Sequence, residues 1–358
     1  MKQKNIPKTP SRKSLKQFLL KGLLFFLPVF LLATSFVIAD PFRLFKTYAD
    51  YSENMYVIPN RDFISTQVYL KNNPVQQYNS FIFGSSRTIA YRTNDWSLHL
   101  GSNARPFVFD ASGESLFGIY TKICYIDRHH GSLKNVLIIL DTDCTFAHEY
   151  DHSDHLGIKD PEVAGTSWLR FYWTFFKAYL DRPFFKSYWR YRLKDCYDAS
   201  MAGYIESRHI RYDVLTNDVY ILNQDALWAK DTARYYKERE SMFYQRPRKE
   251  RVALQKIFRH QYQLFDSIQA IFKRQHTNYR IIISPLYDQV CFNPKDLVVL
   301  NQLFPGHVYD FSGRNRWTED KHNYYENSHY RPSVGHQLLD SIYRRQVGYP
   351  KRRQNKTS

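Results

Sequence analysis

The chain contains 358 residues, of which 43% are hydrophobic and 24% are charged, a composition typical of globular proteins and not of disordered ones. Its net charge is +17, but residues 1–21 and 344–356 supply 13 of these charges through seven and six Lys or Arg with no acid. No nucleic-acid docking motif accompanies the charge, so we predict no nucleic-acid partner.

An apolar segment follows the basic residues 1–21. The run GLLFFLPVFLLATSFVIA at 22–39 carries no charge and is just long enough to cross a membrane as a helix, in which a proline is tolerated. We favour a transmembrane anchor, with residues 1–21 in the cytoplasm and the main domain in the periplasm or outside the cell. A cleaved signal peptide, cut after Ala39, and a buried core helix are the alternatives.

Five short apolar runs come next, and each ends in a polar or glycine-containing turn; they lie at 80–86, 105–113, 134–143, 279–286 and 307–313. Continuous apolar runs indicate strands that are buried on both faces. Helical patterns occur between and after them, at 115–127, 249–275 and 332–346. This alternation predicts an α/β fold, in which a mainly parallel five-stranded sheet lies between two helical layers and binds ligands at the carboxyl ends of its strands.

We assign the α/β domain to residues 40–347, with a large insertion at about 148–248 and a basic tail at 348–358. Residues 168–192 of the insertion, WLRFYWTFFKAYLDRPFFKSYWRYR, are rich in aromatic rings. We predict that the insertion is helical and forms a lid or side wall. Its rings suit ordinary packing or a surface that faces carbohydrate or a membrane. The four cysteines form no C-x-x-C pair, which argues against a metal knuckle and leaves disulfides open; they are Cys124, Cys144, Cys196 and Cys291.

The first predicted strand ends in Gly84-Ser85-Ser86-Arg87. Glycine lets the backbone bend at a strand end, so this stretch is either an ordinary turn or a device that holds a serine nucleophile in the crevice. A serine nucleophile needs a base within hydrogen-bonding distance. His329, after the fifth strand, lies at the same predicted edge of the sheet. Arg87 is expected to contact a substrate oxygen or to pair with an acid.

These residues resemble the motifs of the SGNH (GDSL-type) hydrolases, in particular those of the membrane-anchored envelope branch that includes proteins of teichoic-acid D-alanylation and alginate acetylation. The resemblance implies a flavodoxin-like sheet. It makes Ser86 the nucleophile, Gly113 an oxyanion donor through its amide, and His329 the base. It covers roughly 78–145 and 278–345, but not the aromatic insertion.

Two positions depart from that family. The acid three residues before the histidine is Glu326 where the family has Asp, with Glu319 and Asp320 as other candidates. Asp143 takes the place of an Asn that donates to the oxyanion, and an ionised carboxylate cannot donate. Losing such a donor costs about 10²–10³ in rate in related chemistry.

The resemblance implies a serine esterase or O-acyltransferase that acts on an envelope polysaccharide or a lipid ester and requires no cofactor. Its expected partners are the membrane and an integral-membrane acyltransferase. The alternative is a scaffold without catalytic activity that binds a glycan or such an acyltransferase.

A second resemblance is carried by NVLIILDTDCTF at 135–146, which is similar to the first motif of the haloacid-dehalogenase phosphatases. Asp141 would be the nucleophile, Asp143 the general acid and Ser284 the second motif, with Mg²⁺ nearby. In that family, however, this strand normally opens the core, and the residue after D-x-D is usually Gly and not Cys144. We therefore treat this phosphatase as the lesser alternative.

The segment HEYDHSDHLG at 148–157 places His148, His152 and His155 among acids. A spacing of four residues would let His148 and His152 bind a metal from one face of a helix. The segment is loop-like, however, so we favour a solvated surface and predict no metal site, with substrate contact as the other alternative.

Overall fold

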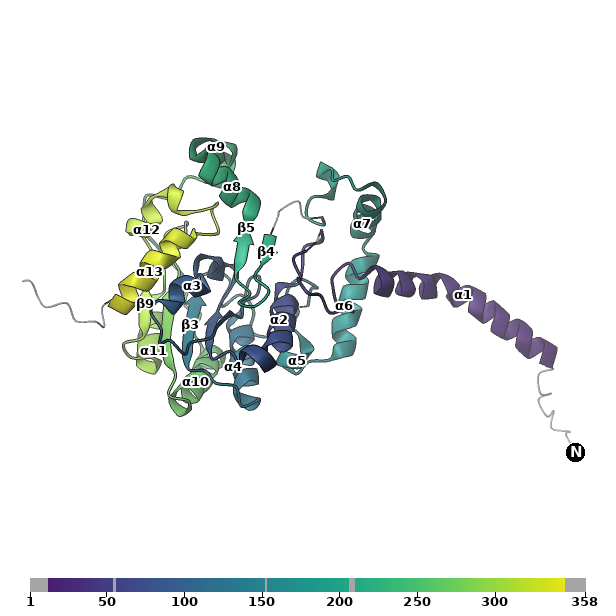
Figure 1. Cartoon of the computed structure of the whole chain (residues 1–358), viewed down its shortest axis with the longest axis horizontal. Coiled ribbons are helices and arrows are strands. Elements are labelled where there is room, and N and C mark those ends of the chain that lie inside the picture. The colour runs from purple at the N-terminus through teal and green to yellow at the C-terminus, as the bar shows by residue number, and fades with distance from the viewer. Residues whose placement is uncertain (1–11, 54–55, 152, 206–209, 345–358) are drawn as a thin grey trace, which may run out of the picture.

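A computed structural model describes residues 12–53, 56–151, 153–205 and 210–344 (Figure 1). The predicted basic tail and much of the basic N-terminal segment lie outside the described residues. The remainder forms an α/β body from which one long helix projects.

The body is organised around one parallel sheet of five strands. These are β1 (Ser80–Phe83), β2 (Pro106–Val108), β3 (Asn135–Leu140), β7 (Asn278–Ile283) and β9 (Val308–Asp310). Their order is β2-β1-β3-β7-β9, and each neighbouring pair is parallel. Counted along the chain this is the order 2-1-3-4-5 of a flavodoxin-like sheet, so the predicted fold class is confirmed.

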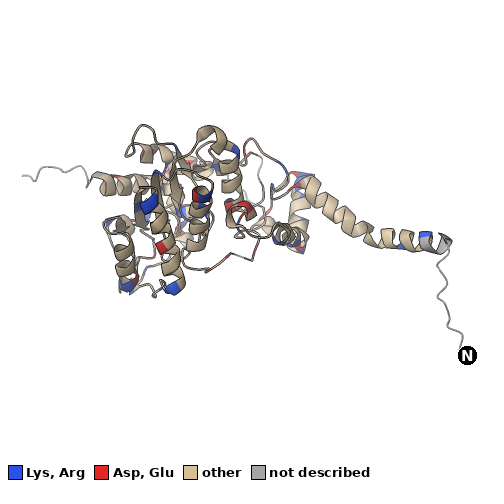
Figure 2. Cartoon of the chain, turned by 90° about the horizontal axis from the view of Figure 1, so that it is seen from below, with Lys and Arg blue, Asp and Glu red and all other residues tan. Residues whose placement is uncertain are grey.

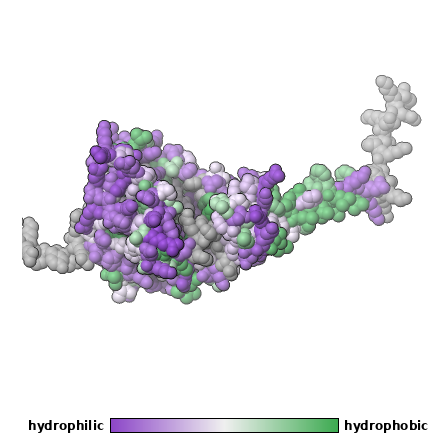
Figure 3. Space-filling view, turned by 90° about the horizontal axis from the view of Figure 1, so that it is seen from above, coloured by the Kyte–Doolittle hydropathy of each residue, from purple (hydrophilic) through white to green (hydrophobic). Residues whose placement is uncertain are grey.

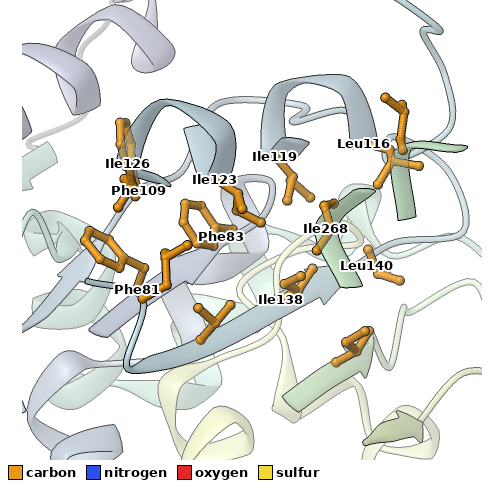
Figure 4. Packing of buried hydrophobic residues seen from close by; sticks show 14 of the residues in the cluster. Phe81, Phe83, Phe109, Leu116, Ile119, Ile123, Ile126, Ile138, Leu140 and Ile268 are labelled. Carbon is orange, nitrogen blue, oxygen red and sulfur yellow. The ribbon is translucent and has the colours of Figure 1, made fainter. Parts of the chain in front are cut away.

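The central parts of the strands are apolar because both faces of the sheet are covered. Successive side chains point to opposite faces, so Phe81 and Phe83 join one core while Ile82 joins the other. Figure 4 shows the first of these cores, in which Ile119 and Ile123 also pack.

Helices cover both faces. The first core includes residues of α2 (Arg61–Gln76), α4 (Leu116–Arg128), α10 (Arg259–Arg274) and α11 (Pro294–Leu303). The second includes residues of α3 (Thr93–Ser97) and α13 (Pro332–Arg344). Short elements complete the body: 3₁₀ turns at Ser86–Ala90 (η1), Glu240–Met242 (η3) and Lys321–Asn323 (η4), strands β6 (Arg251–Val252) and β8 (Val290–Cys291), and α12 (Arg316–Glu319).

The helix predicted over 249–275 begins only at Arg259. Residues Arg251–Val252 instead pair with β8, and the Asp296 carboxylate accepts hydrogen bonds from the Lys256 and Ile257 amides. These contacts hold the first ten residues outside the helix. The sequence does not predict helix α2. Half of the residues that this helix buries are polar or charged, so it shows no clear apolar period.

The insertion contains several separate elements. They are α5 (Pro161–Ala164), α6 (Trp168–Leu180), α7 (Arg182–Lys194), η2 (Ala199–Met201), β4 (Ile210–Tyr212), β5 (Val219–Ile221), α8 (Leu222–Lys230) and α9 (Thr232–Glu238). The ring-rich stretch is helical as predicted. Its two helices meet at Asp181, which ends α6 and caps α7 by accepting the Phe184 amide. All four cysteines are free thiols.

The N-terminal helix α1 (Arg12–Ala39) projects from the body and is long and apolar enough to cross a membrane. Its surface is hydrophobic along most of its length (Figure 3), and its charged residues lie near its N-terminal end (Figure 2). Very little of its apolar window, Lys16–Ala39, is buried, which argues against a core helix. Only its last turns enter the body, where Phe36 is buried against the rings of α6.

A buried group of four charges connects the loop after β2 to three other segments. Lys122 of α4 lies 2.9 Å from Asp62 of α2 and also pairs with Glu114. Lys159 contacts the same two carboxylates from the insertion. Burial disfavours ionisation of Asp62, but the two lysines outweigh it and lower the pKa of Asp62 to about 2. The four charges therefore hold Gly113, the neighbour of Glu114, against α2 and α4.

We predict that Lys159→Met destabilises the fold by about 3–5 kcal/mol, because it leaves two buried carboxylates, Asp62 and Glu114, with Lys122 as their one remaining lysine partner and so with an uncompensated buried charge. Chemical unfolding of the full chain in detergent micelles measures this. Arg234→Met, which breaks the exposed pair with Glu238, is the matched control and should leave the unfolding midpoint unchanged. Equal effects of the two substitutions would contradict the prediction.

Candidate active site

Ser86 is presented at the carboxyl end of β1 by a tight turn. Gly84 has φ of +154°, and a Cβ there would lie 2.8 Å from the Ile139 carbonyl oxygen of β3. Glycine is therefore required both for the backbone conformation and for the close approach. Ser85 then caps η1 by accepting the Arg87 amide, and Ser86, half-buried, is the first residue of that turn.

The sequence prediction that Ser86, His329 and Glu326 meet holds in the structure. The Oγ atom of Ser86 lies 2.8 Å from Nε2 of His329. The Nδ1 atom of His329 is hydrogen-bonded to the Glu326 carboxylate, which also accepts the Ser328 amide at 2.6 Å. A proton on Nδ1 facing Glu326 leaves Nε2 as the acceptor for the Ser86 hydroxyl. The candidate Asp320 pairs instead with His322, at 2.7 Å.

The loop that carries His329 is fixed on both sides. The Tyr325 amide donates to the His329 carbonyl at 2.8 Å, and the Tyr330 hydroxyl contacts the hydroxyls of Ser284 and Tyr91. Next to them, the guanidinium of Arg331 lies against the rings of four aromatic residues, namely Trp228, Tyr235, Tyr236 and Tyr325. Helices α8 and α9 of the insertion thus hold the histidine loop in place.

Ser86 and His329 both line a cavity of about 230 Å³. Four of its wall residues come from the β4–β5 hairpin of the insertion, namely Ile210, Tyr212, Val219 and Ile221, so part of the insertion is a side wall. The cavity is mainly apolar and is smaller than the range of about 300–1,000 Å³ that is usual for drug-sized ligands. It suits a small apolar group next to the serine.

Arg87, which was expected either to contact a substrate oxygen or to pair with an acid, pairs with Asp143, the residue that stands in place of the family's Asn donor. Nη2 of Arg87 lies 2.8 Å from Oδ2 of Asp143, and Nη1 lies 3.2 Å from Oδ1. Nη1 also reaches buried Asp141, while Nε donates to the Ser328 carbonyl at 3.1 Å. Burial disfavours the charge on Arg87, but Asp141, Cys144 and Asp143 hold the pKa of Arg87 above its ordinary value. Arg87 therefore joins the serine turn to β3 and to the histidine loop.

Gly113 follows β2, the neighbour of β1 in the sheet. It has φ of +58°, and its neighbour Ser112 lines the cavity. The two strand-end turns are joined directly, since the Ala111 amide donates to the Gly84 carbonyl at 3.3 Å. The Gly113 turn thus lies at the same edge of the sheet as Ser86.

Asp141, Asp143 and Cys144 approach one another closely enough to share a metal ion. However, the Arg87 guanidinium already supplies a positive charge to both carboxylates, and the Ser85 hydroxyl donates to Asp141. Burial and Asp141 raise the pKa of the Cys144 thiol, and a cysteine sulfur is not among the oxygen ligands that Mg²⁺ prefers. This environment favours a structural ion-pair cluster over a Mg²⁺ site.

The two histidines of 148–157 that the structure describes, His148 and His155, do not lie on a helix. His148 and His155 lie in irregular backbone, and His152 lies outside the described residues. The His155 ring packs against Phe42 and Phe175, and burial lowers its pKa. His155 is thus part of the aromatic packing around α6.

Sequence reasoning missed two features of the site. Arg61 of α2 forms a buried pair with Asp110 at 2.8 Å and lines the cavity with it. Gly335 of α13 lies so close to η1 that a Cβ would be 1.9 Å from the Ala90 carbonyl oxygen. Gly335 is visible in the sequence as the glycine of PSVGHQ. Its contact with Ala90, however, joins positions 245 residues apart, and no local sequence pattern indicates it.

The comparisons with known proteins do not add to this picture. No protein-family model matches the chain, and no curated protein matches it.

We predict that Gly335→Ala destabilises the fold by about 1–3 kcal/mol through overpacking and moves η1, with Ser86, away from His329. Thermal unfolding and ester hydrolysis should both decline. Gly101→Ala is the control, since a Cβ there meets open space. A Gly335→Ala variant as stable and active as the parent would show that the close contact is not needed.

Proposed function

We propose that the protein is a membrane-anchored serine esterase or O-acyltransferase. The observation that carries the proposal is the continuous series of hydrogen bonds from Glu326 through His329 to Ser86, which opens into a small cavity. Serine, imidazole and carboxylate in this order form the arrangement that activates a hydroxyl for acyl transfer.

The proposed reaction has two steps. His329 Nε2 accepts the Ser86 proton as Oγ attacks the ester carbonyl; the ester C–O bond then breaks, and the leaving alkoxide takes that proton. Water or an acceptor hydroxyl next attacks the acyl-serine, giving its proton to His329, and Ser86 Oγ recovers it on release. Glu326 stabilises the imidazolium formed in each step.

The oxyanion requires hydrogen-bond donors beside Ser86. The backbone amides of Ser86 and Gly113 are the candidates, because both lie in turns at the same sheet edge. Asp143 is an acceptor and pairs with Arg87, so it does not take this role.

The cavity size favours a small acyl group, and the anchor favours a substrate near a membrane. The resemblance to SGNH hydrolases supports an ester on an envelope polysaccharide or lipid, with an integral-membrane acyltransferase as a partner. No cofactor takes part in this scheme.

We also propose that α1 remains attached as a single-pass anchor, with its N-terminus in the cytoplasm. Phe36 is only 4% exposed, and Ser35 Oγ lies 2.8 Å from the Tyr179 hydroxyl oxygen. Cleavage after Ala39 would remove both contacts from the aromatic core. An anchor explains why the last turns of an apolar segment pack so specifically.

A scaffold without catalytic activity is the second candidate. The observation that favours it is Asp143, which stands where an Asn donor is expected and is bound to Arg87.

We predict that a fluorophosphonate probe labels the full-length protein and that Ser86→Ala abolishes the labelling, because the activated Oγ is then absent. In-gel fluorescence measures this. Ser112→Ala, which removes another hydroxyl of the cavity, should retain the label.

A parent protein that resists the probe would favour the scaffold. Mg²⁺-dependent hydrolysis of p-nitrophenyl phosphate that survives in Ser86→Ala would favour the phosphatase.

We predict that Glu326→Gln lowers kcat on p-nitrophenyl acetate by about 10²–10⁴, because an uncharged amide neither stabilises the imidazolium nor fixes the tautomer of His329. Steady-state kinetics measures this. Asp320→Asn is the matched control and should leave kcat unchanged, since Asp320 pairs with His322. The reverse pattern would assign the orienting acid to Asp320.

A further inference from the structure

Helix α6 carries an apolar stripe on its outer face. Leu169, Trp173, Phe176 and Leu180 recur at spacings of four, three and four residues, which places them along one side of a helix. Leu169 is 81% exposed and Trp173 is 54% exposed. Lys177 lies beside the stripe and is also exposed.

The fold uses Phe176 of this stripe, which is half-buried and packs against the aromatic cluster of the insertion, while Leu169, Trp173 and Leu180 stay exposed. The opposite side of α6 buries Phe171, Phe175 and Tyr179 in the aromatic cluster of the insertion. Scattered exposed apolar residues are ordinary, but a continuous stripe on a helix indicates a contact surface.

The position of α1 indicates what this apolar stripe contacts. Phe36 of α1 packs on the rings of Phe176 and Tyr179, with centroids 5.5 and 5.3 Å away. Helix α6 thus lies across the end of α1 where that helix leaves the body (Figure 1). Phe36 is three residues from the end of the apolar window, or about 4.5 Å along a helix. The stripe therefore lies near the level at which α1 leaves the hydrocarbon layer.

We infer that α6 is a second membrane contact, which lies in the interface of the bilayer that α1 spans. The exposed stripe of α6 contacts the lipids themselves and not another protein. Tryptophan favours the level of the headgroups, and Trp168 and Trp173 are both exposed on α6. Lys177 can extend along the stripe to reach lipid phosphates. This inference rests on the proposed anchor and is independent of the proposed chemistry.

The contact would fix the orientation of the domain. A single anchoring helix leaves the body free to tilt, whereas an adjoining helix in the interface holds it at a second place. The β4–β5 wall of the cavity belongs to the same insertion as α6. Contact of α6 with the membrane would therefore keep the cavity at a fixed distance from the lipid surface.

Bromine on lipid acyl chains quenches tryptophan at close range and tests the inference directly, because α1 contains no tryptophan. The full-length chain is reconstituted into vesicles of phosphatidylcholine and phosphatidylglycerol, with or without brominated chains. Trp168 and Trp173 are two of six tryptophans, so brominated lipid should quench up to a third of the emission. The double variant Trp168→Phe, Trp173→Phe should lose most of that quenching. Trp317→Phe, on α12, should retain it.

Flotation of the vesicles after an alkaline wash reports on the anchor separately. Protein that floats but shows the same quenching in the parent and the double variant, or none in either, overturns the inference and leaves the anchor intact. Protein that does not float overturns the anchor and the inference together, while the esterase proposal still stands on its labelling experiment.

Discussion

Arg87 is the residue on which the geometry of the site depends. It follows the candidate nucleophile in the chain, pairs with Asp141 at the end of β3, and donates to the Ser328 carbonyl beside the candidate base. Its side chain and that of Asp141 are almost entirely buried. Removing one member of such a pair leaves an uncompensated charge, at a cost of about 3–5 kcal/mol. The guanidinium of Arg87 therefore joins the serine turn to a histidine loop that is 241 residues away in the sequence, alongside the contact between the Tyr330 and Tyr91 hydroxyls.

The sequence sufficed to predict the sheet and the candidate triad, and the reasons are physical. Strands such as β3, buried on both faces, are apolar at nearly every position, here at all but Asn135, and can be recognised without knowledge of their neighbours. Parallel strands place their carboxyl ends at one edge, so residues that follow different strands can be expected to meet. That rule was enough to bring Ser86 and His329 together.

What could not be predicted depends on contacts between distant segments. Helix α2 begins with Arg61 and Asp62, which are buried because Asp110, Lys122 and Lys159 neutralise them. Such a helix has no clear apolar period, since its buried residues include as many polar as apolar side chains. The wall that β4 and β5 form in the cavity, and the aromatic rings packed around Arg331, likewise depend on how the insertion packs against the body. No local sequence pattern predicts them.

These contacts also explain why Asp143 stands where the SGNH hydrolases that the sequence resembles have an asparagine. A buried arginine beside Asp141 supplies five donors, and Asp143 accepts from both Nη1 and Nη2. An asparagine there would offer one acceptor oxygen and no charge, and would leave Arg87 less well paired. The acid that pairs with Arg87 beside the serine turn thus takes the position from which, in the proposed chemistry, an Asn side chain would donate to an oxyanion. An acyl-transfer reaction at this site would have to depend on backbone amides, whose positions are set by the turns at Gly84 and Gly113.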